Sequence, residues 1–193
     1  MIERERKYRL TDAEAAALEA RLDKLAKPLG RERQVTVVFR DKIGVLPKGT
    51  LIRYRDVDGK RELTVKGKKT QSGLDKMRFE WNVELGEGPI IELLAALRIT
   101  PQTRYVKDAL RFDLDGLLVS VDRLEGLGIF CEIEAHDTTT DIDAAAKVLQ
   151  LDRRCFEPRG YPSIAAEAEG TRLRRSDTTA STRKGGSGRS SAA

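Results

Sequence analysis

Two short segments of the sequence each place two carboxylates two residues apart. The chain opens with MIERERKYRL, which carries Glu3, Glu5 and Lys7, and a later segment, IFCEIEA, carries Glu132 and Glu134. In a β-strand alternate side chains point to the same side, so each pair would share one face. Clustered carboxylates supply the hard oxygen ligands that suit Mg²⁺ or Mn²⁺. These two segments are therefore the first candidates for a divalent-metal site.

Basic side chains gather in the same way on other candidate strands. LIRYR places Arg53 and Arg55 on one face, RELTVKGK carries Lys66, and MRFEWNVE places Arg78 and Glu80 together. Lysine and arginine donate hydrogen bonds to phosphate oxygens, and arginine can do so as a bidentate fork. Carboxylates and basic groups together describe a site for a metal ion and a phosphate.

Other common catalytic arrangements are not found in the sequence. GKRELTVKGKKT contains GKKT but lacks the preceding glycine that a phosphate-binding P-loop needs. A Ser–His–Asp triad would depend on His136, the one histidine, which we expect on the surface. Without an obvious protein nucleophile, a metal-activated water is the simplest agent for hydrolysis.

The elements that position these residues are predicted to be mostly strands. Residues 11–30 predict a helix, because Thr11 and Glu14 form a capping box and Pro28 and Gly30 follow its end. From there to residue 135 the pattern mostly has period two and is divided by turn signals. GPIIELLAALR and DIDAAAKVLQL carry apolar stripes at helical spacing. The sequence therefore predicts an α+β fold dominated by an antiparallel sheet.

Each candidate strand has one charged face, and two interpretations of this face stay open. The commoner one is an antiparallel sheet whose polar face lies in solvent. The other is a sheet closed into a barrel, with a charged lumen inside and helices packed outside. Like charges two residues apart on a strand lie about 7 Å apart and repel, which weighs against a simple solvated face. A charged lumen must be wet or occupied, and an anionic, metal-bound ligand would suit it.

The apolar faces of the strands have an ordinary explanation as core. We expect Met77, Phe79, Trp81 and the stripe from Leu93 to Leu97 to pack between the sheet and its helices. Tyr161 is expected either to pack a helix or to contact the mouth of the lumen.

Length and charge divide the chain of 193 residues into two parts. We expect one domain over residues 1–169 and a disordered tail over residues 170–193, which is rich in Ser, Gly and Arg. Residues 171–193 hold six Lys or Arg and one Asp, so the preceding residues carry equal numbers of basic and acidic side chains. The tail could add weak, salt-sensitive affinity for a polyanion, or it could simply solubilise the protein.

The cysteines and the hydropathy indicate the compartment. Cys131 and Cys155 have no CxxC spacing, so neither a zinc site nor a disulfide framework is predicted. No apolar run approaches the roughly 20 residues of a membrane span, and the N-terminus lacks a signal-peptide core. We expect a soluble cytoplasmic protein with no membrane partner.

The order of the motifs resembles one known family. ERERK fits Glu-x-Glu-x-Lys, and it is followed by LIRYR, LTVKGK, MRFE, Lys107, VDRLEGLGIFCEIE and GYPSI. Residues 1 to about 165 are in this way similar to the CYTH proteins, also called triphosphate tunnel metalloenzymes. The resemblance implies an eight-stranded antiparallel β-barrel whose charged lumen binds a triphosphate, with a divalent metal, Mg²⁺ or Mn²⁺, as cofactor.

The resemblance also implies roles for particular residues. Glu3, Glu5 and Glu134 should hold a first metal, and Asp122 and Glu132 should bind a second metal or orient the attacking water. Lys7 should act in catalysis with Asp122 and Glu132. The phosphates should be bound by basic residues of the lumen, namely Lys7, Arg53, Arg55, Lys66, Arg78 and Lys107.

Two positions depart from the family pattern. Relatives often have Lys-x-Arg where this chain has Lys107 and Ala109, and Arg111 lies one pleat further on the same face, so it is included among the phosphate-binding candidates. Asn82 replaces a glutamate that many relatives have, which removes one negative charge from the lumen.

The family includes inorganic, thiamine, nucleoside and RNA triphosphatases and class IV adenylate cyclases. We expect hydrolysis of the terminal phosphate of tripolyphosphate or another small triphosphate, such as a nucleoside or thiamine triphosphate. The alternatives are a class IV adenylate cyclase, which converts ATP to cyclic AMP and pyrophosphate, and a non-catalytic module that binds polyphosphate or triphosphates.

Overall fold

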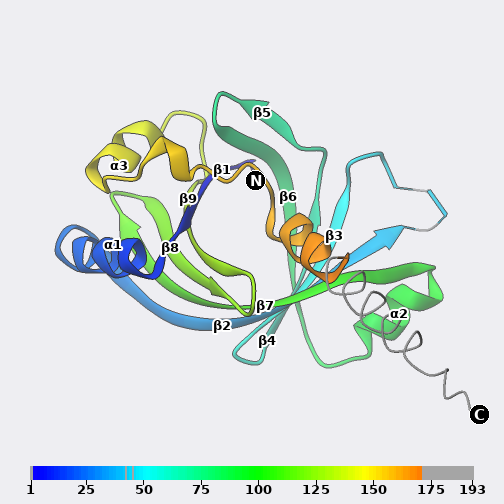
Figure 1. Ribbon diagram of the computed structural model, residues 1–193. Helices are drawn as coiled ribbons and strands as arrows, with labels where there is room; N and C mark the ends of the chain where they lie inside the picture. The colour runs from blue at the N-terminus through cyan, green and yellow to red at the C-terminus, as the bar shows by residue number, and fades with distance from the viewer. Residues whose placement is uncertain (1, 42, 45, 171–193) are drawn as a thin grey trace, which may run out of the picture.

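A single antiparallel sheet dominates the computed structural model, which describes residues 2–41, 43, 44 and 46–170 (Figure 1). Its strands are β1 (Ile2–Leu10), β2 (Lys27–Asp41), β3 (Leu51–Val57), β4 (Lys60–Lys66), β5 (Thr70–Ser72), β6 (Asp75–Leu85), β7 (Ile99–Leu114), β8 (Leu117–Leu124) and β9 (Gly128–Ala135). The helical segments are α1 (Asp12–Leu25), α2 (Ile90–Ala96), α3 (Ile142–Val148), the 3₁₀ turn η1 (Arg153–Cys155) and a helix over residues 161–170.

Eight of these strands form a closed barrel. Their order is β1-β9-β8-β7-β2-β3-β4-β6, and the ring closes because β6 also pairs with β1, with Ile2 opposite Phe79. The short strand β5 pairs with β6 and extends the sheet beyond the ring. The predicted eight-stranded antiparallel barrel is therefore confirmed, and closure removes the free edges that an open sheet would leave.

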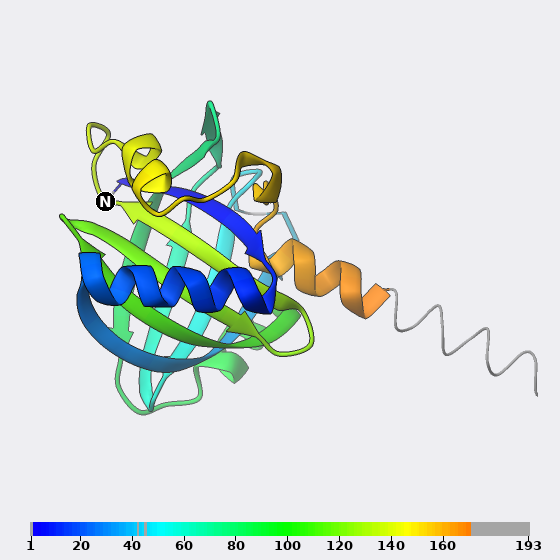
Figure 2. The ribbon, with the colours of Figure 1, turned by 60° about the vertical axis from the view of Figure 1, so that its left-hand side comes forward.

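The main apolar core lies outside the barrel rather than within it. Helix α1 crosses the outer face of the barrel (Figure 2) and buries Leu18 and Leu22, and α3 buries Ile142 in the same cluster. Both helices pack against outward-facing residues of β1, β7, β8 and β9, such as Val121. Thr11 and Glu14 form the predicted capping box at the start of α1. The helices thus cover the outer apolar faces of these four strands, and the charged faces of the strands point into the barrel.

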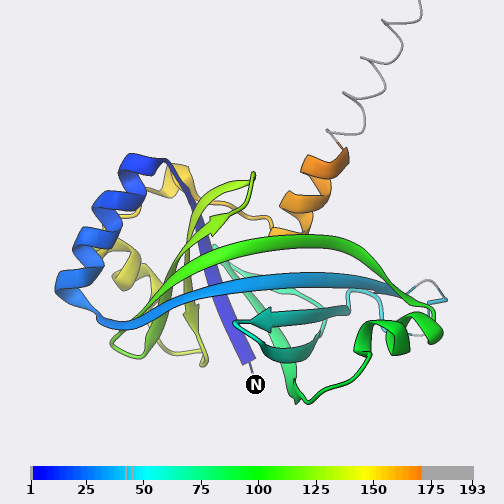
Figure 3. The ribbon, with the colours of Figure 1, turned by 90° about the horizontal axis from the view of Figure 1, so that it is seen from below.

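A second apolar cluster fills one end of the lumen. Phe130 and Leu124 share the inward faces of their strands with charged residues further along, yet here they are fully packed. The helix over residues 161–170 begins next to β7 and points away from the barrel (Figure 3). Its Tyr161 and Ile164 pack into this cluster, which we call the plug. The lumen is thus charged along most of its length and apolar at this end.

The expected packing of the outer face of β6 is wrong. Phe79, Trp81 and Val83 are each more than half exposed, and so are Leu93 and Leu97. Helices α1 and α3 lie over the other side of the barrel, and α2 has only seven residues, of which Leu94 alone is buried. Among the described helices, none is placed to cover β6. Phe79 and Trp81 instead stack on each other, with ring centroids 6.3 Å apart.

The sequence predicts a disordered tail over residues 170–193. Residue 170 belongs to the last helix, and the rest of the predicted tail lies outside the described residues. The predicted boundary at residue 169 stays a prediction. No helix in the described part of the chain has both the length and the apolar character to cross a membrane.

Candidate active site

Three carboxylates from two neighbouring strands meet in the lumen. Glu3 and Glu5 alternate along β1, and Glu134 of β9 is directly opposite Glu5 in the register. One carboxylate oxygen of each lies within 4.8 Å of the others. Because alternate side chains of a strand point to the same side, Glu3 and Glu5 share one face of β1. The pairing of β1 with β9 then brings Glu134 next to them. The three oxygens form a hard, anionic donor set of the kind that Mg²⁺ and Mn²⁺ take.

Burial and mutual repulsion make these carboxylates reluctant to ionise together. Burial first, and then the neighbouring charge of Glu134, raise the pKa of Glu3 to about 8. Burial and Glu132 raise the pKa of Glu134 to about 7. Burial acts in the same direction on Glu5, but Lys7 and Lys76 outweigh it and lower the pKa of Glu5. A bound cation would relieve the repulsion between these carboxylates, so the cluster favours cation binding.

Two buried lysines join the remaining predicted carboxylates. Lys7 Nζ lies 2.8 Å from Glu132 Oε1, and Lys107 Nζ lies 2.8 Å from Asp122 Oδ2 and 3.7 Å from Glu132 Oε2. Burial opposes the charge of both lysines, but these carboxylates raise the pKa of each. Lys7 and Lys107 are therefore fixed as ammonium ions beside the lumen.

Asp122 lies deeper than the prediction required. It is fully buried, lines neither of the two lumen cavities described below, and also accepts a hydrogen bond of 2.7 Å from the Tyr161 hydroxyl. Glu132, in contrast, lines the smaller cavity. The two residues that the resemblance groups together thus occupy different positions, Glu132 at the surface of the lumen and Asp122 behind Lys107.

Arginines of β3 face the lumen with free donor groups. Arg53 donates to Thr64 Oγ1 at 3.0 Å through Nη2, while Arg55 lines both cavities beside it. Within the described residues, the Nε atoms of Arg53 and Arg55 are buried without a hydrogen-bond partner. Burial and then Arg55 lower the pKa of Arg53. Two adjacent guanidinium groups whose Nε donors are buried and unmet are suited to an anion with several oxygens.

The other predicted basic residues also reach the lumen. Lys66 contacts Glu80 and lies 3.3 Å from Glu3 Oε1 through Nζ, so it borders the carboxylate cluster. Arg78 lines the smaller cavity. Arg111 lines the larger one, where its Nη1 donates to Glu32 Oε1 at 2.6 Å. The charged face of each strand, to which the sequence pattern assigned these side chains, therefore faces the lumen.

Lys76 is a lumen residue that the sequence interpretation missed. Its Nζ lies 3.2 Å from Glu5 Oε1, and the side chain is almost fully buried. Lys76 is two residues before Arg78, so extending the alternation of β6 by one pleat would have placed it on the charged face. Its pairing with Glu5 depends on the closure between β1 and β6, which places the two residues opposite each other.

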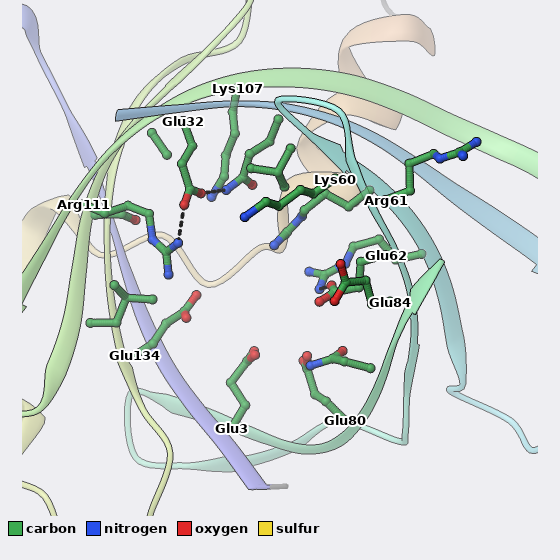
Figure 4. A pocket seen from close by; sticks show the side chains of 18 of the residues that line it. Glu3, Glu32, Lys60, Arg61, Glu62, Glu80, Glu84, Lys107, Arg111 and Glu134 are labelled. Atoms are coloured by element: carbon green, nitrogen blue, oxygen red, sulfur yellow. Dashed lines mark hydrogen bonds and ion pairs between the residues drawn. The ribbon is translucent and has the colours of Figure 1, made fainter. Parts of the chain in front are cut away.

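Two cavities follow one another along the lumen. The larger, of about 430 Å³, is lined by six acidic and six basic side chains, and Glu3, Glu80 and Glu134 point into it (Figure 4). The exposed His136, as predicted on the surface, lies at its rim. The smaller, of about 170 Å³, is lined by six basic and three acidic side chains and ends against residues 160–163. The smaller cavity, which we call the inner chamber, is the more favourable place for an anion.

Comparison with known proteins identifies a family. The CYTH domain model matches residues 1–161. No match was found among curated proteins. A conserved hypothetical protein from Pyrococcus furiosus is 25% identical and superposes with a TM-score of 0.72, covering 84% of this chain and 99% of its own.

Two further solved structures share the fold at lower identity. An adenylate cyclase candidate from Vibrio parahaemolyticus is 17% identical, with a TM-score of 0.69 and coverage of 85% of this chain and 97% of its own. The adenylyl cyclase candidate HpAC1 from Hippeastrum, for which a dominant triphosphatase activity is described, is 18% identical with a TM-score of 0.57 and coverage of 88% and 96%.

Proposed function

This chain belongs to the CYTH domain family, and we propose that it is a divalent-metal-dependent triphosphatase. Its substrate is inorganic tripolyphosphate or another small triphosphate, and the bond cleaved is the terminal phosphoanhydride. The family and the fold support an enzyme that acts on a triphosphate. The choice of hydrolysis and of this substrate class is our proposal.

The observation that carries the proposal is the adjacency of two unlike sites in one closed lumen. The carboxylates of Glu3, Glu5 and Glu134 converge within 4.8 Å, and the inner chamber beside them has twice as many basic as acidic side chains. A triphosphate chain carries several negative charges and binds divalent metals, so it needs both a cationic wall and a carboxylate-held cation. A solvated sheet face needs neither.

The residues of the chain have distinct proposed roles. The unmet Nε donors of Arg53 and Arg55 bind phosphate oxygens, and Lys66, Arg78 and Arg111 add positive charge along the lumen. Lys7 and Lys107, fixed by their carboxylates, stabilise the charge that develops on the leaving phosphate. Holding these donors in place before the reaction avoids the cost of reorganising them during it.

The donor set of Glu3, Glu5 and Glu134 fits Mg²⁺ or Mn²⁺, because it offers three carboxylate oxygens and no sulfur or imidazole. Such an ion supplies charge neutralisation and activation of water when bound. Glu132 reaches the inner chamber and is our candidate for orienting the attacking water. Asp122 acts through Lys107, which it contacts, rather than at the chamber surface.

The test is phosphate release from tripolyphosphate, ATP and thiamine triphosphate with Mg²⁺ or Mn²⁺, with cyclic AMP assayed in the ATP reactions. Glu5→Gln removes one charge from the carboxylate cluster with little change of shape. Glu92→Gln makes the same change on the exposed face of α2 and serves as the matched control. We expect metal-dependent release by the native protein and by Glu92→Gln, and at least a hundredfold loss in Glu5→Gln.

Other outcomes separate the alternatives. Cyclic AMP formed together with pyrophosphate would make the protein a cyclase. Tight binding of tripolyphosphate without turnover of any substrate would make it a binding module. Full activity in the presence of a chelator would contradict the assignment of the carboxylate cluster to a metal.

A further inference from the structure

Tyr161 lies at the boundary between the plug and the charged part of the lumen. Its ring packs edge-on against Phe130 at 5.3 Å and against Tyr105 at 6.0 Å between centroids, and only 5% of the residue is exposed. The same residue lines the inner chamber. One side of Tyr161 therefore belongs to the apolar packing and the other to the candidate active site.

The hydroxyl of Tyr161 contacts a carboxylate that already holds a lysine. It donates to Asp122 Oδ2 at 2.7 Å, and the same oxygen accepts from Lys107 Nζ at 2.8 Å. Asp122 is fully buried, so each of these two donors contributes strongly to the position of its carboxylate. Loss of the hydroxyl would leave Lys107 as the donor to Oδ2 and free the pair to rotate.

The ring of Tyr161 contacts both lysines directly. Lys7 Nζ lies 3.9 Å from the ring centroid, and Lys107 Nζ lies 5.3 Å from it. Both distances are within the range of a cation–π interaction, which is stronger where the ammonium is removed from water. Lys7 also donates to Glu132 and to the carbonyl oxygen of Arg159 at 3.3 Å, in the turn that leads to Tyr161.

We infer that Tyr161 is a positioning residue that fixes two ammonium groups for a phosphate chain bound along the lumen, that of Lys7 in the inner chamber and that of Lys107 in the larger cavity. The ring supports Lys7, and the hydroxyl, through Asp122, sets the orientation of Lys107. The inference rests on the proposed function, because it assumes that these lysines act on a triphosphate. It gives the helix over residues 161–170 a role in positioning these lysines, in addition to filling one end of the lumen.

Two substitutions separate the roles of the ring and the hydroxyl. Tyr161→Phe keeps the ring and removes the hydroxyl, whereas Tyr161→Leu removes both. Tyr54→Phe removes a hydroxyl from an outward-facing side chain and controls for the chemical change. Ile164→Ala weakens the plug without touching a lysine and controls for lost packing. Each variant is measured for kcat and KM with tripolyphosphate, for Tm, and for the NMR shifts of the lysine side chains.

We expect Tyr161→Phe to lower kcat about tenfold with KM changed less than threefold, because the other basic groups still bind the phosphates. Tyr161→Leu should lower kcat further and raise KM. Lysine methylene signals shifted upfield by the ring should persist in Tyr161→Phe and disappear in Tyr161→Leu. Ile164→Ala should lower Tm while kcat and KM stay within twofold of native.

Two results would overturn the inference while leaving the proposed function in place. An active native protein whose kcat is unchanged in Tyr161→Phe and Tyr161→Leu would show that Tyr161 only packs. Native lysine signals without an upfield shift would show that no ring lies over Lys7. A native protein that neither binds nor cleaves tripolyphosphate fails at an earlier step, and it would overturn the proposed function together with this inference.

Discussion

Replacing Glu3 with glutamine is expected to stabilise the metal-free protein at pH 8 and to change its stability little at pH 5. The pKa of Glu3 is raised to about 8 by burial and by Glu134. The folded state therefore binds this proton more tightly than the unfolded chain does. The contribution of Glu3 to stability is greatest below about pH 4.5, where the carboxyl is protonated in both the folded and the unfolded state, and it falls as the pH rises toward 8. Glutamine carries no charge at any pH and removes this loss.

The size of the effect follows from the two pKa values. The pKa of Glu3 is about 8 in the fold against a usual 4.5, a difference that corresponds to about 5 kcal/mol at 1.36 kcal/mol for each tenfold change. Glu134, with a pKa of about 7, titrates in the same range, and the two carboxylates raise each other's pKa. Because their contributions overlap, we expect the substitution to recover about 3 kcal/mol at pH 8.

The assay is urea unfolding in the presence of a chelator between pH 5 and pH 8.5. The native protein should lose stability over this range, and Glu3→Gln should lose much less. Glu92→Gln, on the exposed face of α2, should keep the native slope. Added Mg²⁺ should stabilise the native protein more at pH 8 than at pH 5, because protons no longer compete for the carboxylates.

A native stability that is constant or rises between pH 5 and pH 8 would refute the reasoning. So would an unchanged slope in Glu3→Gln, because the carboxylates would then be ionised together without cost. A Mg²⁺ effect of equal size in native protein and variant would place the ion elsewhere.

Two further predictions concern packing and the turn before the last helix. Trp81→Ser should lower the free energy of unfolding by less than about 1 kcal/mol, because Trp81 is 58% exposed. Phe130→Ala should lower it by about 3–5 kcal/mol, because it leaves a cavity in the plug. Comparable losses for the two variants in urea unfolding would contradict this prediction. Hydrogen bonds from Arg159 are the main cause that lowers the pKa of Glu157 to about 2, so its stabilisation is present above pH 4.5 and lost as the pH falls through 2. Glu157→Gln should therefore cost about 1–2 kcal/mol at pH 7, after allowance for the partly exposed Arg159, and much less at pH 2, where half of the carboxyls are protonated in the fold. An equal cost at both pH values would disprove this prediction.

The alternation of the strands made most of the candidate site predictable. Strand parity places Glu3 with Glu5 on one face of their strand and Arg53 with Arg55 on one face of theirs, because alternation is a property of the backbone within each strand. The order of motifs resembled the CYTH family, and the family match over residues 1–161 confirms it. The capping box of Thr11 and Glu14 was also predictable, because its contacts are made between residues three apart.

Other features depend on contacts between distant strands. The pairing of β1 with β6 closes the barrel and brings Lys76 to Glu5, although these residues are far apart in the chain. Asp122 of β8 is likewise in contact with Lys107 of β7 and with Tyr161 of the last helix, which are distant from it in the chain. The alternation of side chains tells which face of a strand a residue occupies. It does not tell how far along the barrel axis, or how deeply buried, the side chain lies.

By itself, the sequence determined which side chains share a face, where α1 begins and which family the chain resembles, because these depend on local periodicity and on motif order. Only the tertiary structure decided that the charged faces point inward, that Phe130 and Tyr161 close one end of the lumen, and that Trp81 stays exposed. An alternating strand is equally compatible with a solvated sheet and a charged lumen. The difference arises from barrel closure and from where the helices pack, and both are set by long-range contacts.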